Sequence, residues 1–89
     1  MENKPYFENR GHGVFYTDGK CDYAYSIVDD HGDVAFILKV FVKPELRGKG
    51  LSAKIMQRTV EYFSSLGRKV KPLCSYAIRY MEKHDLIEK

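Results

Sequence analysis

Apolar and polar residues alternate through the first half of the chain, which is the pattern of β-strands with one buried face. Clusters of glycine and aspartate separate these runs and predict turns. We therefore expect four strands, over residues 6–9, 14–16, 21–28 and 34–42. The fourth run is apolar on both faces except at Lys39, which predicts a strand at the buried centre of a sheet.

The second half of the chain changes to the spacing of an amphipathic helix. The residues that recur on one helical face are Leu51, Ile55, Thr59, Val60, Phe63 and Leu66. Gly67 predicts the end of this helix, and a strand over 70–73 and a last helix capped by Ser75 follow. The expected order is ββββ-α-β-α, an α+β fold with a mixed, twisted sheet of about five strands and two helices. Because a helix connects them, the last two strands should be parallel neighbours.

Composition indicates one folded domain over residues 1–89, since hydrophobic residues make up 44% of the chain and aromatic residues 13%. No apolar run approaches the roughly 18 residues of a membrane span, and the first residues do not form a signal peptide. We therefore expect a cytoplasmic protein with no membrane association. Cys21 and Cys74 are too few for a disulfide framework or a zinc site, and the three histidines lack ligand spacing, so no metal is expected.

Residues 42–52 form a glycine-spaced basic loop between the fourth strand and the first helix. Such a loop leaves the first backbone N–H groups of the helix without intrahelical partners, and these groups attract an anion together with the helix dipole. Gly48 and Gly50 let the backbone approach the anion, and Arg47 and Lys49 add positive charge at the rim. Phosphate is the expected occupant. The spacing is not that of a Walker loop, and the rest of the chain is too short for a dinucleotide-binding fold.

The loop resembles the acyl-CoA pyrophosphate loop of the GNAT superfamily of N-acetyltransferases, which reads Arg/Gln-x-x-Gly-x-Gly/Ala. The residues in its six places are Arg47, Gly48, Lys49, Gly50, Leu51 and Ser52. Ser52 stands where the family prefers glycine or alanine. A second stretch, Pro72-Leu73-Cys74-Ser75-Tyr76, resembles a short, single-domain subgroup with a Pro-x-Cys-x-Tyr motif. The resemblance covers about residues 13–84.

This resemblance implies a small GNAT-like fold with acetyl-CoA as cosubstrate. In that fold two parallel strands splay apart, and the backbone near Val40 and Val42 pairs with the pantetheine arm as if it were another strand. The pyrophosphate would lie on the loop over 47–52. The thioester would lie in the gap between the strands, close to Cys74.

Three residues near the expected thioester are candidates for acyl transfer. Cys74 follows a strand at a helix N-terminus, where the helix dipole favours a thiolate. We interpret it as an acyl-accepting nucleophile or as an acid for the departing CoA thiolate, with a small core residue as the alternative. The resemblance adds Tyr76 and Tyr80, because GNAT enzymes commonly protonate the leaving thiolate with a tyrosine of the final helix. Both tyrosines also fit ordinary packing.

Charge is divided unevenly along the chain. Residues 1–38 carry three basic and seven acidic side chains, whereas residues 39–71 carry nine basic and two acidic ones. A positive block draws CoA, but it equally draws nucleic acid. Two hypotheses follow: an N-acetyltransferase that moves acetyl from CoA to a primary amine on an exposed acceptor, or a non-catalytic acyl-CoA-binding or nucleic-acid-binding module. We favour the first, with an unknown acceptor that is macromolecular rather than small, and we do not expect nucleic acid as a partner.

Overall fold

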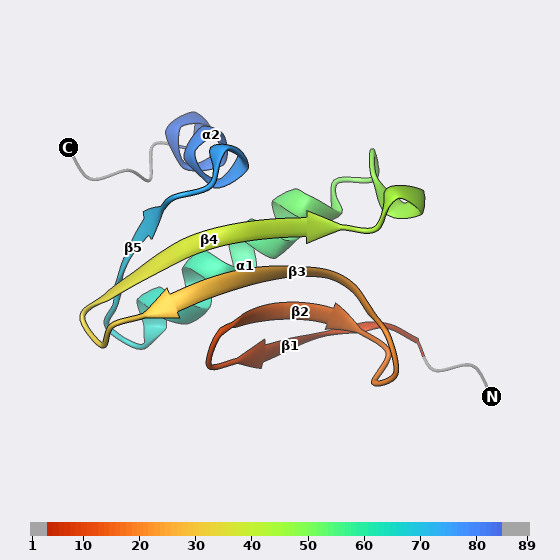
Figure 1. Ribbon diagram of the computed structural model, residues 1–89, viewed down its shortest axis with the longest axis horizontal. Coiled ribbons are helices and arrows are strands. Elements are labelled where there is room, and N and C mark those ends of the chain that lie inside the picture. Colours follow the sequence, from red (N-terminus) through yellow and green to blue (C-terminus); the bar gives the residue numbers. More distant parts are fainter. Residues whose placement is uncertain (1–3, 85–89) are drawn as a thin grey trace.

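The computed structural model describes residues 4–84 and has the expected order of elements (Figure 1). The bounds are β1 Tyr6–Arg10, β2 Gly13–Thr17, β3 Asp22–Asp30, β4 Val34–Val42, the 3-10 turn η1 Pro44–Leu46, α1 Leu51–Ser65, β5 Lys69–Pro72 and α2 Ser75–Lys83. The α+β class, the five-stranded mixed sheet and the two helices are therefore confirmed.

The strands are ordered β1-β2-β3-β4-β5 across the sheet. Tight turns join the first four strands, which are antiparallel, whereas α1 crosses between β4 and β5, which are parallel as predicted. The parallel ladder is short and runs from Val34 opposite Lys69 to Ile37 opposite Pro72. Beyond Ile37, β4 continues to Val42 while the other chain segment turns into α2. In Figure 1, β4 and β5 start from the same corner of the sheet and diverge.

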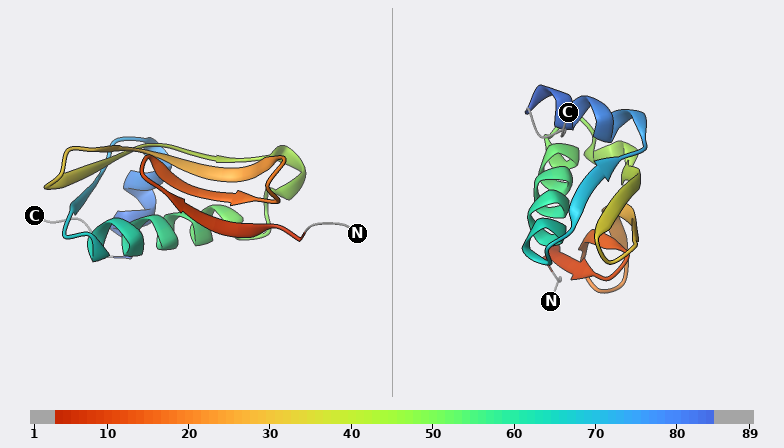
Figure 2. Two further views of the ribbon diagram at one scale, coloured as in Figure 1. Left: turned by 90° about the horizontal axis from the view of Figure 1, so that it is seen from below. Right: turned by 90° about the vertical axis from the view of Figure 1, so that its left-hand side faces the viewer.

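One face of the sheet carries the hydrophobic core. α1 lies along this face, and α2 packs against the same side (Figure 2). The largest cluster joins β3, β4 and both helices through Val28, Ala35, Ile37, Met56, Phe63, Ala77 and Met81. Full burial of a side chain of this kind contributes about 1.5 to 3 kcal/mol. A buried hydrogen bond of 2.7 Å between the hydroxyl groups of Ser26 and Thr59 also links β3 to α1.

The opposite face corrects the prediction made for the fourth strand. No helix within residues 4–84 covers this face, and a stack of aromatic rings crosses three strands instead. The ring centroids of Phe15 and Tyr25 are 5.4 Å apart, and those of Tyr25 and Phe41 are 5.1 Å apart. Leu38 is 44% exposed and Lys39 is exposed, beside a shift in the register of β4 with β3. The prediction of burial on both faces was wrong because no helix of the described residues covers the outward side chains: the Tyr25 ring stacks on Phe41, whereas Leu38 stays exposed.

The helix ends agree with the prediction at one place and differ at another. Gly67, with φ of 82°, follows the last turn of α1 and ends it as expected. Cys74, rather than Ser75, is the N-cap of α2, because its backbone is extended and its sulfur accepts the Ala77 N–H at 3.3 Å. No helix in the described part of the chain is long and apolar enough to cross a membrane.

Candidate functional site

The loop after β4 presents an open helix N-terminus. The chain passes through Gly48 and Gly50, whose φ angles of 82° and 77° lie in the left-handed region. Gly50 is the N-cap of α1 and supplies no capping side chain, and the first turn contains no acidic residue. A Cβ at Gly50 would meet no atom within 4 Å, so the space directly beside the N-cap is open. This end of the helix therefore retains its affinity for an anion.

The free edge of β4 adjoins this loop. The Lys43 N–H donates to β3 at 2.9 Å, so the backbone groups of the alternate residues Val40 and Val42 point away from β3 and toward the gap. No strand within residues 4–84 pairs with them there, because the parallel ladder stops at Ile37. Arg47 Nε donates to the Val42 carbonyl at 3.1 Å. A ligand that pairs with this carbonyl would have to displace that bond.

A cavity of about 220 Å³ brings three of the predicted segments together. Its lining consists of Val40, Phe41 and Val42 of β4, Arg47 and Ser52 of the loop, and Tyr76 of α2. These segments are distant in the sequence and meet because β4 and β5 diverge. Phe41 was not predicted, since the family resemblance implied only its two neighbours, whose backbone groups pair with the pantetheine arm.

The other residues predicted for the loop lie outside this lining. Lys49 and Leu51 border a second hollow of about 190 Å³, together with Tyr16 and Lys54. The glycines shape the turn. Within residues 4–84, no group of three histidine, cysteine, aspartate or glutamate side chains is placed to hold a metal ion.

Cys74 lies where β5 passes into α2. The N–H groups of Leu73 and Cys74 donate to the Ile37 carbonyl at 2.9 and 3.3 Å, which anchors this junction at the point where the strands part. The half-buried Cys74 side chain packs against the main core, and its sulfur accepts the capping bond. The structure therefore gives Cys74 a capping and packing role and places it outside the lining of the 220 Å³ cavity.

The two tyrosines of α2 lie in different surroundings. Tyr76 is 37% exposed and lines the cavity. Tyr80 packs against the main core, with its ring centroid 4.3 Å from that of His84. Burial raises the pKa of Tyr80, with a smaller contribution from Tyr76, so the Tyr80 hydroxyl keeps its proton at neutral pH. Of the two, Tyr76 is the tyrosine that the fold brings to the predicted loop residues.

Four basic residues of the second half lie toward opposite ends of α1. Arg47 and Lys49 lie before the N-terminus of α1, whereas Arg68 and Lys71 follow its C-terminus. The helix between them has 15 residues and is about 22 Å long. Arg68 also pairs with Asp30 through two hydrogen bonds of 2.9 and 3.3 Å, which lower the pKa of that carboxyl group. Of these four residues, Arg47 is the one that lines the 220 Å³ cavity.

Comparison with known proteins identifies the family. The family described as GCN5-related N-acetyl-transferase matches residues 12–89. Over 53 residues the chain is 38% identical to a protein of Archaeoglobus fulgidus named "Uncharacterized N-acetyltransferase". That match covers 60% of this chain and 36% of the relative's length. The family match extends over β2 to α2, which form most of the fold. The chain therefore belongs to the GCN5-related N-acetyltransferase family.

Proposed function

We propose that this chain binds acetyl-CoA in the gap between β4 and β5 and transfers the acetyl group to a primary amine. The observation that carries the proposal is the cavity in which a free strand edge meets an open helix N-terminus. Phosphate oxygens suit the N–H groups of α1 and the guanidinium of Arg47. The amide groups of pantetheine suit the backbone edge at Val40 and Val42. Membership of the family supports the same cosubstrate.

The direct route of transfer needs one proton donor. The amine nitrogen attacks the thioester carbonyl carbon, the bond from this carbon to sulfur breaks, and the CoA thiolate takes up a proton. The proton that the amine loses passes to solvent. We assign the donor to Tyr76, because it lines the cavity, and retain Tyr80 as the second candidate because its raised pKa keeps it protonated.

A second route uses Cys74 as the nucleophile. Its sulfur attacks the thioester, CoA leaves, and the amine then takes the acetyl group from the cysteine. This route requires the sulfur to give up its capping bond to the Ala77 N–H. The direct route does not, and for that reason we place it first.

We propose that the acceptor amine protrudes from a macromolecule. β1 ends at Arg10 and β2 begins at Gly13, so a short turn and no helix lies between them. The outer face of the sheet is accordingly open within residues 4–84. An open surface suits a lysine side chain or a chain terminus better than a small amine, which needs enclosure to be recognised.

Transfer is tested by incubating the protein with acetyl-CoA and polylysine, with spermidine as the small-amine comparison, and measuring released CoA thiol and product mass. Tyr76→Phe should bind CoA and slow the release if Tyr76 is the donor. Cys74→Ser and Cys74→Ala should both bind CoA and lose transfer if the sulfur is the nucleophile, whereas Cys74→Ser should stay active if it only packs. CoA binding without transfer to either amine would favour a non-catalytic acyl-CoA-binding module.

A further inference from the structure

The start of β3 and the end of β4 hold a thiol and an amine in direct contact. Lys43 Nζ lies 2.8 Å from Cys21 Sγ, although the two residues are 22 positions apart in the sequence. Both side chains are half-buried. We propose that this pair is a site of self-acetylation, in which Cys21 takes an acetyl group from acetyl-CoA and passes it to Lys43.

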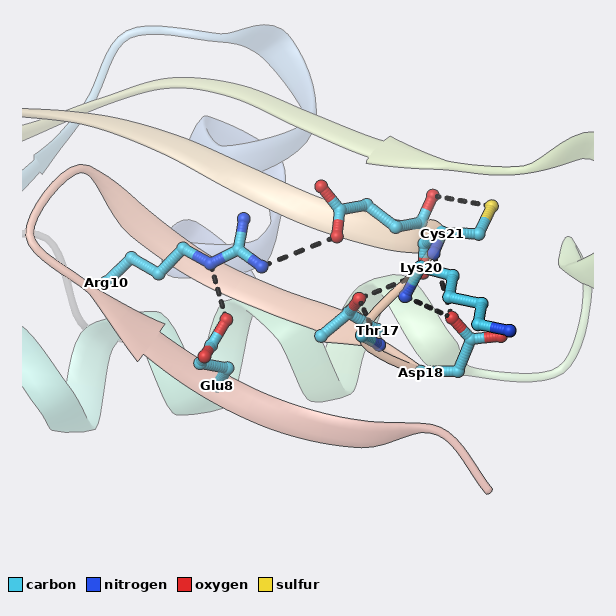
Figure 3. A network of polar contacts seen from close by, with 8 residues as sticks. Glu8, Arg10, Thr17, Asp18, Lys20 and Cys21 are labelled. Atoms are coloured by element: carbon cyan, nitrogen blue, oxygen red, sulfur yellow. Dashed lines mark hydrogen bonds and ion pairs between the residues drawn. The ribbon is translucent and has the colours of Figure 1, made fainter. Parts of the chain in front are cut away.

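A hydrogen-bonded turn holds the thiol in place. One carboxylate oxygen of Asp18 accepts the N–H groups of Lys20 and Cys21 at 2.8 Å each, and the other accepts the Tyr23 hydroxyl at 2.6 Å. The Thr17 hydroxyl donates to the Cys21 carbonyl at 2.9 Å. Figure 3 shows Thr17 and Asp18 beside the backbone of Lys20 and Cys21. The bonds from the Tyr23 hydroxyl and from the two N–H groups lower the pKa of Asp18 to about 2, so the turn is held by a carboxylate at neutral pH.

The amine is held from the other side. The backbone N–H of Lys43 donates to the Tyr23 carbonyl at 2.9 Å, and its ammonium lies 5.0 Å from the centroid of the Tyr23 ring. The hydrogen bond with Cys21 raises the pKa of Lys43, so the amine is protonated while the sulfur is free. Acetylation of the sulfur removes this contribution and makes loss of the proton from the amine easier.

The two steps balance without an oxidant. In the first, the Cys21 sulfur attacks the carbonyl carbon of acetyl-CoA, the bond from that carbon to the CoA sulfur breaks, and CoA leaves with the proton of the thiol. In the second, the Lys43 ammonium gives one proton to solvent, its nitrogen attacks the new thioester, the bond from the carbon to the Cys21 sulfur breaks, and an amide forms. The second proton that the nitrogen loses restores the thiol. The contact makes the second step intramolecular, which favours Lys43 over other lysines.

The acetyl donor here is acetyl-CoA from solution and not a molecule bound in the gap. Cys21 lies at the loop end of β4, whereas Cys74 and the expected thioester position lie near Ile37. The modification therefore does not depend on the proposed function. The functional consequence of the modification rests on the proposed function. Acetylation removes a positive charge from Lys43, which precedes η1, and so should weaken binding of CoA by the loop.

The test is incubation of the purified full chain with acetyl-CoA, followed by digestion and mass spectrometry of each lysine. Lys43 should be acetylated at least about tenfold faster than the average of the other lysines. Cys21→Ser should bring Lys43 to that average. The loss of the thiol also removes the contribution that raises the Lys43 pKa, so a larger fraction of the amine is unprotonated, and a slower rate cannot come from a smaller unprotonated fraction. Acetylation of Lys43 in this variant by N-acetoxysuccinimide controls for access to the amine.

Two further variants separate this site from the gap. Cys74→Ala removes the other cysteine, and Gly50→Asp blocks the loop; neither should slow acetylation of Lys43. Retained acetylation in Gly50→Asp would support the relay even if CoA binding in the gap is never detected. Wild-type acetylation of Lys43 in Cys21→Ser would overturn the relay. Its loss in Cys74→Ala or in Gly50→Asp would also overturn it, because the gap would then be the source of the acetyl group.

Discussion

Replacing Gly50 with aspartate should abolish CoA binding while the protein stays folded. Gly50 has φ of 77°, a conformation that costs a non-glycine residue about 1 to 3 kcal/mol and that aspartate tolerates better than most. A Cβ at this position meets no atom within 4 Å. A carboxylate at this end of α1 stabilises the folded protein by about 0.3 to 1 kcal/mol through its interaction with the helix dipole. The free energy of unfolding should therefore fall by no more than about 2 to 3 kcal/mol.

The effect on CoA should be larger, because the carboxylate competes for the N–H groups of α1 and repels the pyrophosphate. Two like unit charges 4 Å apart repel by about 1 kcal/mol in bulk water and by about 4 kcal/mol at an effective dielectric constant near 20. The pyrophosphate carries about two charges, which gives about 2 to 8 kcal/mol. Affinity should then fall by at least about 30-fold.

Titration calorimetry at fixed ionic strength measures this loss, and circular dichroism checks the fold. Gly67→Asp is the matched control, because Gly67 has φ of 82° and equally open space but follows the opposite end of α1. It should bind CoA as the wild type does. Gly50→Asn covers the N–H groups without adding charge and should give an intermediate affinity. Unchanged CoA affinity in a folded Gly50→Asp protein would refute the assignment of the loop, and an equal loss in Gly67→Asp would attribute the effect to backbone strain.

Three further outcomes are expected. An oligonucleotide, titrated by fluorescence anisotropy, should bind weakly and without saturation at physiological salt, because Arg47 and Lys49 lie at the opposite end of α1 from Arg68 and Lys71; a tight complex that weakens steeply with salt would contradict this. Thr59→Val should lower the free energy of unfolding in urea by about 1 to 3 kcal/mol, since Thr59 gives its proton to the Ile55 carbonyl and Ser26 would lose its acceptor; the exposed Ser64→Ala should change it by less than about 0.5 kcal/mol. The stabilisation from Asp18 should be complete above its ordinary pKa of 3.8 and should disappear as the pH falls through its folded value of about 2. The melting temperature of Asp18→Asn should change less with pH over that range than the melting temperature of the wild type does. An equal pH dependence in the two proteins would contradict the hydrogen bonds assigned to the Asp18 carboxylate.

The order of elements was predictable because the hydrophobic period changes from strand to helix spacing across the glycine loop. Val40 and Val42 were predicted only through the family resemblance, because the hydrophobic period of β4 does not reveal which of its backbone groups stay unpaired beyond the ladder. The cap of α2 was predicted at Ser75 because serine is the commoner cap. The Ile37 carbonyl instead receives two N–H groups from residues 73 and 74, and the chain bends one position earlier, at Cys74.

Two features of the site depend on pairing register, which no local pattern supplies. The contact of Cys21 with Lys43 exists because the start of β3 lies beside the end of β4. The bond from Arg47 to the Val42 carbonyl depends on how the loop folds back over the strand edge. The exposure of Leu38 was missed for a different reason, because an apolar run does not reveal whether another element will cover its outward side chains.

The gap between β4 and β5 is also a boundary between parts of different local stability. β1 to β4 pair with neighbours in the sequence, whereas Val34 and Lys69, which pair across the parallel ladder, lie 35 positions apart. Contacts that close so long a segment form late during folding, and the short unit of β5 and α2 should open before the rest of the native sheet does. A ligand bonded to both sides of the gap would fasten this unit to the four-stranded part. Occupancy of the gap should therefore slow amide hydrogen exchange in β5 and α2 more than in β2 and β3.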